Sequence, residues 1–389
     1  MKIRIARAVR PMILAGLLAL GGVFSGPARA GEEDLRIGVI LPLSGPFALV
    51  GREIKAGIET FMAQNPATLG GRAVVLIFRD SQGAGHIAKR EAQELVVNEH
   101  VAILAGLGTT PDALAVAPVA TQADLPMIVM GSGGGAVTSA SANIVRTAFN
   151  IGQIASVAGS YLAGTGKRTA VSLVADFGPG IESETGFAKA FEAGGGKMIA
   201  TLRSPFESPA FAPFLQRAAD LHPDGLFLFV PQGQNAVLMR EFAERGLARS
   251  GIGLITTGDV LDESLIDQIG PAVLGVTSIY HYSDVHPSAL NQRFVADFER
   301  VSGGLRANMM GVSGYDGMRL IQLTLEKTKG QTKEFVAAAK GLAWESPRGQ
   351  VRIDPATRDI EQDMYVRRVE RRGDRLVNVE IATVPVPVR

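Results

Sequence analysis

The sequence contains no cysteine among its 389 residues. Disulfide bonds, thiol chemistry and thiolate metal sites are therefore excluded. Charged residues make up only 20% of the chain and hydrophobic residues 46%, which excludes wholesale disorder and predicts a sizeable packed core. A chain of this length has room for two ordinary domains, and its core alone must hold them together.

The apolar stretch near the N-terminus, residues 12–24, is too short to span a bilayer. It has 13 residues, whereas a transmembrane helix needs roughly 20. Four basic residues precede it, and "ARA" at 28–30 follows with the spacing of a cleavage site. These features predict a signal peptide over residues 1–30, cut after Ala30, rather than a membrane anchor. No cysteine follows to carry a lipid, so we expect a protein that is free in the periplasm or its equivalent.

The chain has no excess of basic residues once residues 1–30 are set aside. The whole chain has 39 Lys and Arg against 38 Asp and Glu, but the first 30 residues hold five of the basic residues and none of the acidic ones, so the remainder carries a net charge of −4. No basic stripe lies beside an aromatic platform, and we expect no nucleic-acid partner. The locally basic stretch 367–375 is interrupted by acidic residues, which is typical of a solvated hairpin turn.

Complete nucleotide-binding motifs are also absent. The segment "GSGGGA" at 131–136 has the letters of a dinucleotide fingerprint, but no helical pattern follows it and no acidic residue lies about 20 positions on to hold a ribose. A P-loop fails because Arg168, not Ser or Thr, follows Gly166 and Lys167. We therefore expect no nucleotide cofactor.

Catalytic and metal-binding patterns are equally weak. The sequence has no G-x-S-x-G nucleophile elbow, and Ser132 has no histidine in an obvious supporting loop. The segment "HYSDVHP" at 281–287 holds two histidines and an aspartate, but it lacks the helical spacing or the second pair of ligands that a metal site needs. We place it on a hinge or at the surface, and we expect no enzyme, no catalytic residues, no metal and no cofactor.

Short apolar runs alternate with helical patterns along the rest of the chain. The first series comprises strand 35–41, a helical face over 54–62, strand 72–78, helix 86–99, strand 101–106, helix 111–123 and strand 126–130. The second comprises helix 152–164, strand 168–175, helix 181–194, strand 197–203, a helix near 210–220, strand 225–230, helix 234–247, strand 252–258, a short helix over 261–269 and strand 272–280. Long helices over 287–301 and 307–328 follow, and then antiparallel strands. This order predicts an α/β fold of two units, each a parallel sheet with helices on both faces.

Loops that follow parallel strands meet at one edge of a sheet, where ligands bind in open α/β folds. In the first unit these loops contain Ser44, Phe47, Thr109, Thr110, Ser132, Gly133 and Gly134. Successive glycine N–H groups are typical of an anion nest, and a small carboxylate fits this loop best. A threonine at a helix start is either an N-cap or, together with the helix amides, a partner for that carboxylate.

Three residues stand out at the corresponding edge of the second unit. Phe177 lies on a Gly-Pro-Gly turn, an unusual place for a core phenylalanine, and Gln232 lies in the loop "VPQGQN". Asp259 either caps the helix 261–269 or faces a ligand cation, and the residues alone leave both alternatives open.

Several segments, taken in order, resemble one family. They include "IGVILPLSGPFALVGREIKAGIETF", "DSQGAGHIAKREAQELV", "ILAGLGTTPDALAVAPVATQADLPMI", "DFGPGIESETGFAKAF", "TTGDVLDES" and "GYDGM". The chain resembles the type I periplasmic solute-binding proteins of ABC importers, in the leucine/isoleucine/valine-binding branch, over essentially all of 31–389. The resemblance implies two Rossmann-like lobes joined by a three-segment hinge near 147–150, 281–284 and 347–350, with the ligand cleft between them. The implied lobes are 31–148 plus 283–348, and 149–282 plus 349–389.

The resemblance also implies roles for particular residues. Thr110, Ser132 and Gly133 would hold a ligand carboxylate, Asp259 an α-ammonium group, and Phe177 would supply an aromatic wall. Relatives often carry an aromatic residue where this chain has Pro231 and Gln232, and a tyrosine where it has Phe177.

Pro231 and Gln232 in place of an aromatic residue, and Phe177 in place of a tyrosine, weaken the prediction that the ligand is leucine, isoleucine or valine. Some similar relatives with a "TGD" loop and a "WESPRG" tail suit aromatic or other organic acids. We expect a monomer that captures an amino acid of the branched-chain type, or a related small carboxylate, and delivers it to an ABC permease at the inner membrane. The alternatives are a binding protein for aromatic or other organic acids, and a ligand sensor without transport.

Overall fold

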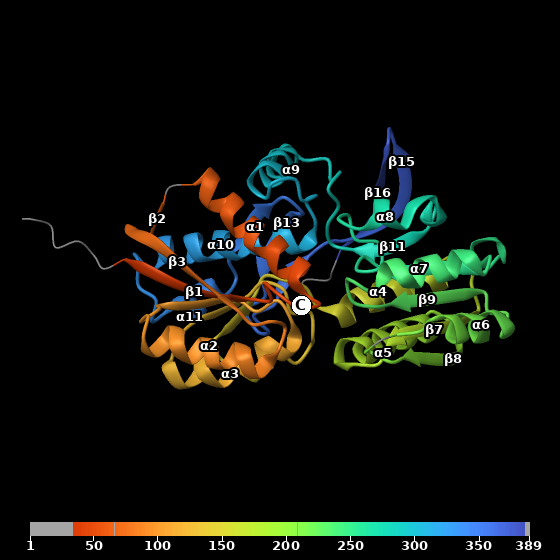
Figure 1. Ribbon diagram of the computed structural model, residues 1–389, viewed down its shortest axis with the longest axis horizontal. Helices are drawn as coiled ribbons and strands as arrows, with labels where there is room; N and C mark the ends of the chain where they lie inside the picture. Colours follow the sequence, from red (N-terminus) through yellow and green to blue (C-terminus); the bar gives the residue numbers. More distant parts are fainter. Residues whose placement is uncertain (1–33, 66, 208, 386–389) are drawn as a thin grey trace, which may run out of the picture. The chain divides into compact units, whose positions relative to one another are not determined.

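The structure is a computed structural model that describes residues 34–65, 67–207 and 209–385. The expected signal peptide over 1–30 lies outside these residues. Two mainly parallel-stranded sheets organise the chain, one in the red-to-yellow part of Figure 1 and one in the green part, to which blue strands from the C-terminal end are added. The α/β fold expected from the sequence is confirmed. Within the described residues, no helix is both long and apolar enough to cross a membrane.

The first sheet has the strand order β2-β3-β1-β4-β5-β6. Its strands are β1 (Leu35–Leu41), β2 (Thr68–Leu69), β3 (Arg72–Asp80), β4 (Ile103–Gly106), β5 (Met127–Val129) and β6 (Ile144–Arg146). All neighbours are parallel except the short edge strand β2. The helices of this part are α1 (Ala48–Gln64), α2 (Gly85–Val97), α3 (Thr110–Ala123), the 3-10 turn η1 (Thr138–Ala140), α9 (Ala289–Val301), α10 (Met309–Lys327) and α11 (Phe335–Ala339).

Apolar side chains point to both faces of the sheet along β1, which explains why helices cover both faces. Successive side chains of a strand point to opposite faces. Ile37 and Val39 join a core cluster with residues of α1 and α10, whereas Ile40 joins a separate cluster with Leu95 of α2 and Val116 of α3. A strand buried on both faces is continuously apolar, which is why "LRIGVIL" is readable from the sequence.

The second sheet has the order β16-β15-β11-β10-β9-β7-β8. Its strands are β7 (Thr169–Ala175), β8 (Lys197–Ser204), β9 (Gly225–Phe229), β10 (Gly253–Thr257), β11 (Thr277–Tyr280), β15 (Met364–Arg372) and β16 (Arg375–Val384). Strands β7 to β11 run parallel, and β15 and β16 add an antiparallel hairpin. The helices are α4 (Ile151–Gly164), α5 (Gly178–Ala193), α6 (Ala212–Asp220), α7 (Asn235–Glu244), η2 (Leu247–Arg249), α8 (Ile266–Ile269) and η3 (Gly270–Val273).

Strand β9 shows the same alternation as β1. Phe227 packs with Phe187 of α5 on one face, their ring centroids 4.3 Å apart, and Leu228 packs in the cluster that contains Leu238 of α7 on the other. Burying each of these side chains contributes about 1.5–3 kcal/mol. The hairpin turn expected in 367–375 is confirmed, with Arg372 and Arg375 paired across it, but Arg367 at the start of that stretch is buried and not solvated.

Two local predictions were wrong. The Gly-Pro-Gly segment is not a turn but the start of α5, which begins at Gly178 with Pro179 in its first turn. Proline suits that position because the first N–H groups of a helix have no partner inside it. The helix expected over 261–269 is only α8, four residues long, because Asp262 and Ser264 hydrogen-bond to each other and hold the preceding residues in turns.

The chain passes between the two sheets three times. It leaves the first sheet after β6, returns after β11, and enters the second sheet again at β15. Before that last passage, β12 (Ala343–Ser346), β13 (Gly349–Ile353) and β14 (Ile360–Gln362) form a separate three-stranded sheet. Arg348 ties two passages together by donating to the carbonyl oxygens of Thr147 (2.6 Å) and Ala148 (3.1 Å). Membership of a sheet does not assign every residue to a lobe, so the lobe boundaries stay a prediction.

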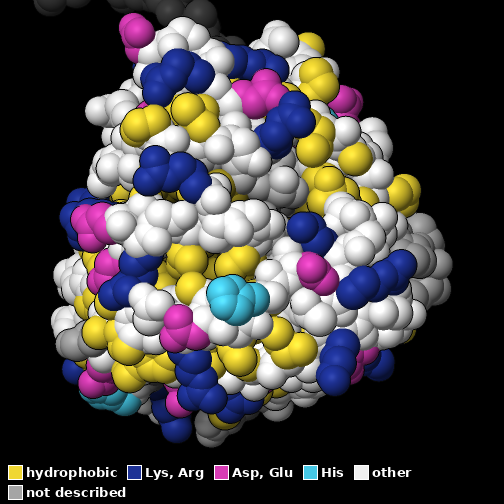
Figure 2. Space-filling model, turned by 90° about the vertical axis from the view of Figure 1, so that its right-hand side faces the viewer, with side chains coloured by type: hydrophobic (Ala, Val, Ile, Leu, Met, Phe, Trp, Pro, Cys, Tyr) yellow, Lys and Arg dark blue, Asp and Glu magenta, His cyan; other side chains and the backbone are white. Residues whose placement is uncertain are grey.

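Charged side chains of both signs are intermixed over the face shown in Figure 2. Lysines and arginines alternate there with aspartates and glutamates, and apolar side chains lie between them. Surface charge on this face therefore does not mark a functional site, which has to be sought in the cavities.

Candidate functional site

A cavity of about 520 Å³ lies where the loops at the carboxyl ends of both parallel sheets meet. Cavities of this size are typical of sites for small molecules. The loops after β1, β4 and β5 line it from the first sheet, and the loops after β7, β8, β9 and β10 from the second. Eight of the residues that the sequence singles out line it: Phe47, Thr109, Thr110, Ser132, Gly133, Phe177, Gln232 and Asp259.

Main-chain donors gather at the end of the cavity formed by the first sheet. Among the described residues, no acceptor engages the N–H groups of Ser132 and Gly133. Helix α3 begins beside them at Thr110, and Thr109 is its N-cap, whose hydroxyl oxygen accepts from Asp112 N at 3.3 Å. A helix N-terminus and free N–H groups favour an anion. This end of the cavity is chemically suited to a carboxylate.

The hydroxyl of Ser132 is directed away from this role. Its Oγ lies 2.7 Å from the carbonyl oxygens of both Leu107 and Thr109, so its single hydrogen is committed to the main chain. Only the backbone N–H of Ser132 remains for a ligand. The hydroxyl instead ties the loop after β5 to the loop after β4.

The glycines of this loop are required by space rather than by backbone conformation. A Cβ on Gly133 would lie 2.4 Å from Cε2 of Phe149, and one on Gly131 would lie 2.7 Å from Cα of Gly108. Neither glycine has a positive φ, so the predicted nest, which needs a left-handed residue, is not formed. The glycines therefore allow the loop to pack closely and do not form a nest.

Phenylalanines from both sheets form the wall of the cavity. The rings of Phe177 and Phe206 stack with centroids 4.7 Å apart, and Phe47 stacks on Phe206 across the cavity at 6.3 Å. Phe229 lies 6.1 Å from Phe177 with nearly parallel planes. Such a wall favours a flat apolar group, because aromatic rings gain from stacking as well as from burial.

A carboxylate lies in the loop after β10. Asp259 is buried, and its Oδ1 accepts from the hydroxyl of Tyr280 at 3.1 Å, while its Oδ2 has no partner among the described residues. Burial raises the pKa of Asp259 to about 6, so it is mostly ionised at pH 7. Helix α8 begins at Ile266, with Leu265 as its N-cap, and the capping alternative for Asp259 is therefore wrong.

Gln232 links the cavity to a buried acid that the sequence analysis does not single out. Its Nε2 lies 3.3 and 3.1 Å from the two carboxyl oxygens of Glu53 on α1, and 3.3 Å from Ser264 Oγ. The side-chain oxygen of Gln232 is buried without a partner. Burial, and then the nearby charge of Asp262, raise the pKa of Glu53 to about 8. Glu53 lies on α1, which packs on the first sheet, and Gln232 lies in the loop after β9 of the second sheet, so this contact joins the two sides of the cavity.

Comparison with known proteins identifies the family. The family model described as "Periplasmic binding protein" matches residues 34–374. The chain belongs to this family of periplasmic binding proteins. The sequence resemblance to type I solute-binding proteins is confirmed.

Individual relatives of this periplasmic binding protein cover nearly its whole length. The Leu/Ile/Val-binding protein homolog 6 of Brucella melitensis is 38% identical over 93% of this chain and 94% of its own. A solute-binding protein of an ABC transporter from Rhodopseudomonas palustris BisB5, solved with 3,4-dihydroxybenzoic acid, is 42% identical, with a TM-score of 0.87 over 91% of this chain and 97% of its own. One from R. palustris, solved with 4-hydroxybenzoate, is 38% identical, with a TM-score of 0.87 over 92% and 98%.

Two predicted site residues of this periplasmic binding protein do not line the cavity. Ser44 is exposed, and its hydroxyl donates to Asp80 Oδ2 at 2.7 Å. The N–H of Gly134 donates to Thr110 Oγ1 at 3.2 Å and so helps to position the Thr110 side chain. Sequence reasoning missed Phe206, Phe229 and Phe149, which read as ordinary apolar residues within strands or beside them.

The histidine segment of this periplasmic binding protein is not at the surface throughout. His281 is fully buried and stacks on Phe149 with centroids 5.6 Å apart; its burial holds its pKa well below the usual value. His286 lies 3.0 Å from Glu380. Within the described residues, no three His, Cys, Asp or Glu side chains converge as a metal site would require.

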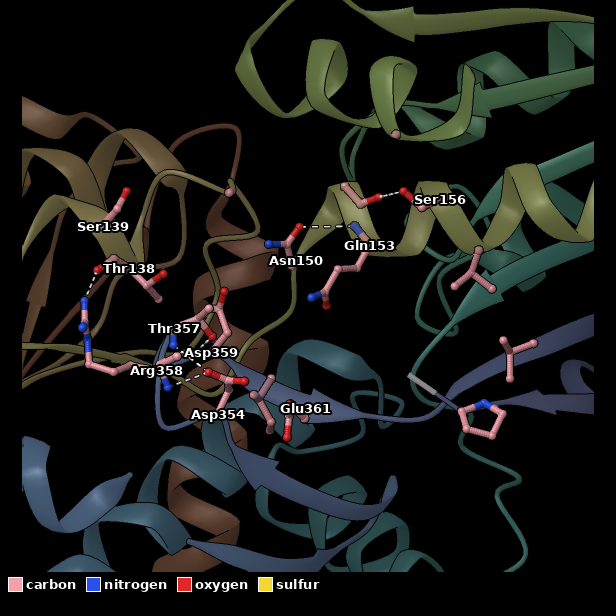
Figure 3. Close-up of a pocket in the computed structure, with 18 of the residues that line it drawn as sticks. Thr138, Ser139, Asn150, Gln153, Ser156, Asp354, Thr357, Arg358, Asp359 and Glu361 are labelled. Carbon is pink, nitrogen blue, oxygen red and sulfur yellow. Dashed lines mark hydrogen bonds between the residues drawn. The ribbon is translucent and has the colours of Figure 1, made fainter. Parts of the chain in front are cut away.

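A second, larger cavity of about 1150 Å³ is shown in Figure 3. Several of its polar side chains are paired within the chain. Asn150 accepts from Gln153 N at 3.3 Å, Arg358 donates to Thr138 O at 2.5 Å, and Asp354 accepts from Thr357 N at 2.6 Å. None of the described side-chain atoms that are buried without a partner belongs to its lining. The smaller, aromatic cavity is therefore the better candidate site.

Proposed function

We propose that this protein is the substrate-binding component of an ABC importer and that it captures an aromatic monocarboxylate of the benzoate class in the periplasm. The observation that carries the proposal is the pairing of free main-chain donors with a phenylalanine wall in one cavity. An aromatic acid has the matching pair of features, an anionic end and a flat apolar ring.

The binding mode follows from the placement of these groups. The carboxylate of the ligand lies against the N–H groups of Ser132 and Gly133 and the start of α3, with Thr109 and Thr110 beside it. Charge-assisted hydrogen bonds of this kind strengthen as water is excluded. The ring lies against Phe177 and its stacked neighbours.

Contacts across the cavity describe how a ligand would be enclosed. Gly135 N, in the first sheet's loops, donates to Glu182 Oε2 of α5 at 2.7 Å. Gln232 reaches Glu53 from the opposite side, and Phe47 stacks on Phe206. We propose that the lobes open by a hinge motion that breaks these three contacts and that the closed form docks on a permease.

The relatives solved with hydroxylated benzoic acids support this substrate class, since they are 42% and 38% identical over more than nine-tenths of this chain. A second candidate is a branched-chain amino acid. Asp259 favours it because a buried carboxylate suits an α-ammonium group, and the Brucella relative carries a leucine/isoleucine/valine name. The two candidates differ in charge. A branched-chain amino acid carries a cationic ammonium group as well as its carboxylate, whereas a benzoate-class acid carries only the carboxylate.

A thermal-shift screen followed by calorimetry distinguishes the candidates. Ligands that bind only the native state raise its melting temperature by mass action. We expect benzoate-class acids to raise the melting temperature and to bind in the micromolar range or tighter, and leucine, isoleucine and valine to have no effect. A response to the amino acids alone would overturn the proposal and establish the second candidate.

Export and transport need separate measurements. N-terminal sequencing of the periplasmic fraction should begin at Gly31 if the signal peptide is cut as proposed. Deletion of the gene should abolish uptake of a labelled aromatic acid by intact cells. A strain that still takes up the acid but loses its transcriptional response to it would favour a sensor without transport.

A further inference from the structure

Two buried carboxyl groups lie where the two sides of the aromatic cavity meet. Glu53 belongs to α1, whose apolar side chains pack in the core of the first sheet, and Asp262 belongs to the loop after β10 of the second sheet. Glu53 is fully buried, and Asp262 is only 3% exposed. Neither residue lines the cavity, so neither is placed to contact a ligand there.

Neutral hydrogen-bond donors connect these carboxyls across the two sides. Asn308, the N-cap of α10, places its Nδ2 3.1 and 3.3 Å from the two oxygens of Asp262. In the opposite direction, Gln232 of the second side donates to both oxygens of Glu53. The Nε2 of Gln232 also lies 3.3 Å from Ser264 Oγ, and Ser264 donates its N–H to Asp262 at 2.9 Å. Each carboxyl is therefore held by an amide from the opposite side, and the two are joined through Ser264.

A compensating cation is missing from this network. Within the described part of the chain, no lysine or arginine forms an ion pair with either carboxyl. Burying two like charges without a cation is unfavourable, because burial penalises each charge and the charges repel. A proton on one of them removes the repulsion and leaves a group that can donate as well as accept a hydrogen bond. The raised pKa of Glu53, about 8, agrees with a proton on this residue at neutral pH.

The other charged groups on the surrounding elements have partners of their own. Glu263 is held by Arg367 and Asn378, which both belong to the second sheet, so separation of the lobes leaves these contacts in place. Asp262 is the charged group that acts on Glu53. The remaining pairs are Lys55 with Glu59 on α1, Arg306 with Asp284, Asp316 of α10 with Arg348, and Asp259 with the hydroxyl of Tyr280.

Resting on the hinge motion of the proposed function, we infer that Glu53 and Asp262 form a proton-dependent latch that holds the lobes closed and releases the ligand faster as pH rises above 7. Parting the lobes separates Glu53 from Gln232 and Asp262 and lets water reach it, so it becomes an ordinary, ionised glutamate at neutral pH. The closed form therefore binds one proton more than the open form. A form that binds an extra proton is disfavoured as pH rises.

The latch acts on ligand release because a bound ligand leaves from the open form. Glu53 titrates at about 8 in the closed form and near its ordinary 4.5 in the open form, so the ratio of closed to open protein falls about fivefold between pH 7 and 8. The dissociation rate of a bound acid should rise by the same factor. This holds whether the protein without ligand is mostly open or mostly closed, because only the ligand-bound forms are compared.

Surface plasmon resonance on the immobilised protein measures this rate. Benzoate and 4-hydroxybenzoate serve as probes, because between pH 7 and 8 their carboxyls are ionised and the ring hydroxyl keeps its proton. We expect both acids to dissociate about fivefold faster at pH 8 than at pH 7.

Two substitutions remove the charge from one member of the pair. In Glu53→Gln, the amide oxygen can still accept from Gln232 but nothing titrates, so the rate should be the same at both pH values and slower than that of wild type at pH 8. Asp262→Asn keeps an oxygen that accepts from Ser264 and Asn308 and loses the repulsion, so the rise with pH should be smaller than in wild type. A purely structural role of either residue would change the rates equally at both pH values.

Glu182→Gln is the matched control. Glu182 also joins the two sides of the cavity, but through the N–H of Gly135 at 2.7 Å and not through a second carboxyl. Its replacement should change the dissociation rate by the same factor at pH 7 and pH 8 and leave the rise with pH in place.

The possible outcomes separate the latch from the proposed function. Equal dissociation rates at pH 7 and 8 in wild type would overturn the latch and leave the proposed function standing. A rise with pH that Glu53→Gln retains would place the proton on another group and overturn the assignment to Glu53. If neither acid binds at either pH, the proposed function fails, and leucine then replaces the acids in the same series and tests the latch by itself.

Discussion

Arg348 and Asp316 form an ion pair from which water is fully excluded, with 2.7 Å between Arg348 Nη2 and Asp316 Oδ2. Asp316 also accepts from Trp344 Nε1 at 2.9 Å and from Ser346 Oγ at 2.8 Å. The motifs "GYDGM" and "WESPRG", which lie about 30 residues apart, are thus one buried cluster beside the passages between the sheets. Their role in this structure is architectural, although they contribute to the sequence resemblance.

Replacing Arg348 should destabilise the protein strongly. Arg348→Met leaves the carboxylate of Asp316 buried without its cation, which costs about 3–5 kcal/mol in the free energy of unfolding. It also removes the donors to the carbonyls of Thr147 and Ala148. Urea denaturation measures the loss. Arg352→Met, which breaks the more exposed pair with Glu361, should cost less than about 1 kcal/mol; equal losses would contradict this account.

The glycine at position 133 should tolerate no side chain. In Gly133→Ala the new Cβ meets the ring of Phe149, which packs against His281 and Tyr280 and has little room to move. Overpacking of this kind costs about 1–3 kcal/mol. Thermal unfolding should show the loss, and aromatic acids should bind more weakly because Phe149 lines the cavity. Gly164→Ala, whose Cβ meets nothing within 4 Å, should be neutral or slightly stabilising.

The sequence predicts the sheets well because their strands are buried on both faces. Continuous apolar runs such as "LRIGVIL" and "GLFLF" have few other structural explanations, and the order of elements then places the loops at the carboxyl edges. Eight of ten singled-out residues line one cavity for that reason. Their roles as ligand contacts stay a prediction.

Side-chain direction is what the sequence does not predict. Glu53 lies on a helix whose acids are expected to face solvent, and only the tertiary fold buries it against Gln232. Ser132 stands in a loop suited to anions, yet its hydroxyl turns to two carbonyl oxygens. The sequence pattern also predicts too long a helix at α8, because hydrogen bonds of Asp262 and Ser264 compete with helix formation.

Removal of the Ser132 hydroxyl should affect stability more than binding. Ser132→Ala breaks the hydrogen bond to the main chain between two loops, and we expect a loss of about 1 kcal/mol in the free energy of unfolding. Affinity for 4-hydroxybenzoate should change less than about threefold, because the backbone N–H remains as the donor. Calorimetry and urea denaturation on the same preparation separate the effects. A large loss of affinity at unchanged stability would show that the hydroxyl itself binds the carboxylate.

The stability of the ligand-free protein should fall as pH rises from about 7 to 8. At lower pH the buried His281, whose pKa lies well below its usual value, acts in the opposite direction to the buried carboxyls. Glu53 has its pKa raised from 4.5 to about 8, mainly by burial and then by Asp262. The native state therefore binds more protons than the unfolded state in this range, and the free energy of unfolding decreases with pH. Asp112 and Asp259, with pKa values raised to about 6, act in the same direction at the acid end. Glu263, raised to about 7 by burial, adds to it.

Glu53→Gln isolates the contribution of one group to this slope. The substitution removes a titrating carboxyl while it keeps the size of the side chain and a hydrogen-bonding end. One such group contributes up to about 1.4 kcal/mol per pH unit between its two pKa values, so the variant should have a flatter profile of melting temperature between pH 6 and 8. Carboxyls with lowered pKa values, such as Asp80 and Asp354, act only near pH 4 and below and do not mask the effect. Parallel profiles for wild type and variant would mean that Glu53 is already ionised in the native state, and the repulsion from Asp262 would then have to be relieved by water or by a local rearrangement.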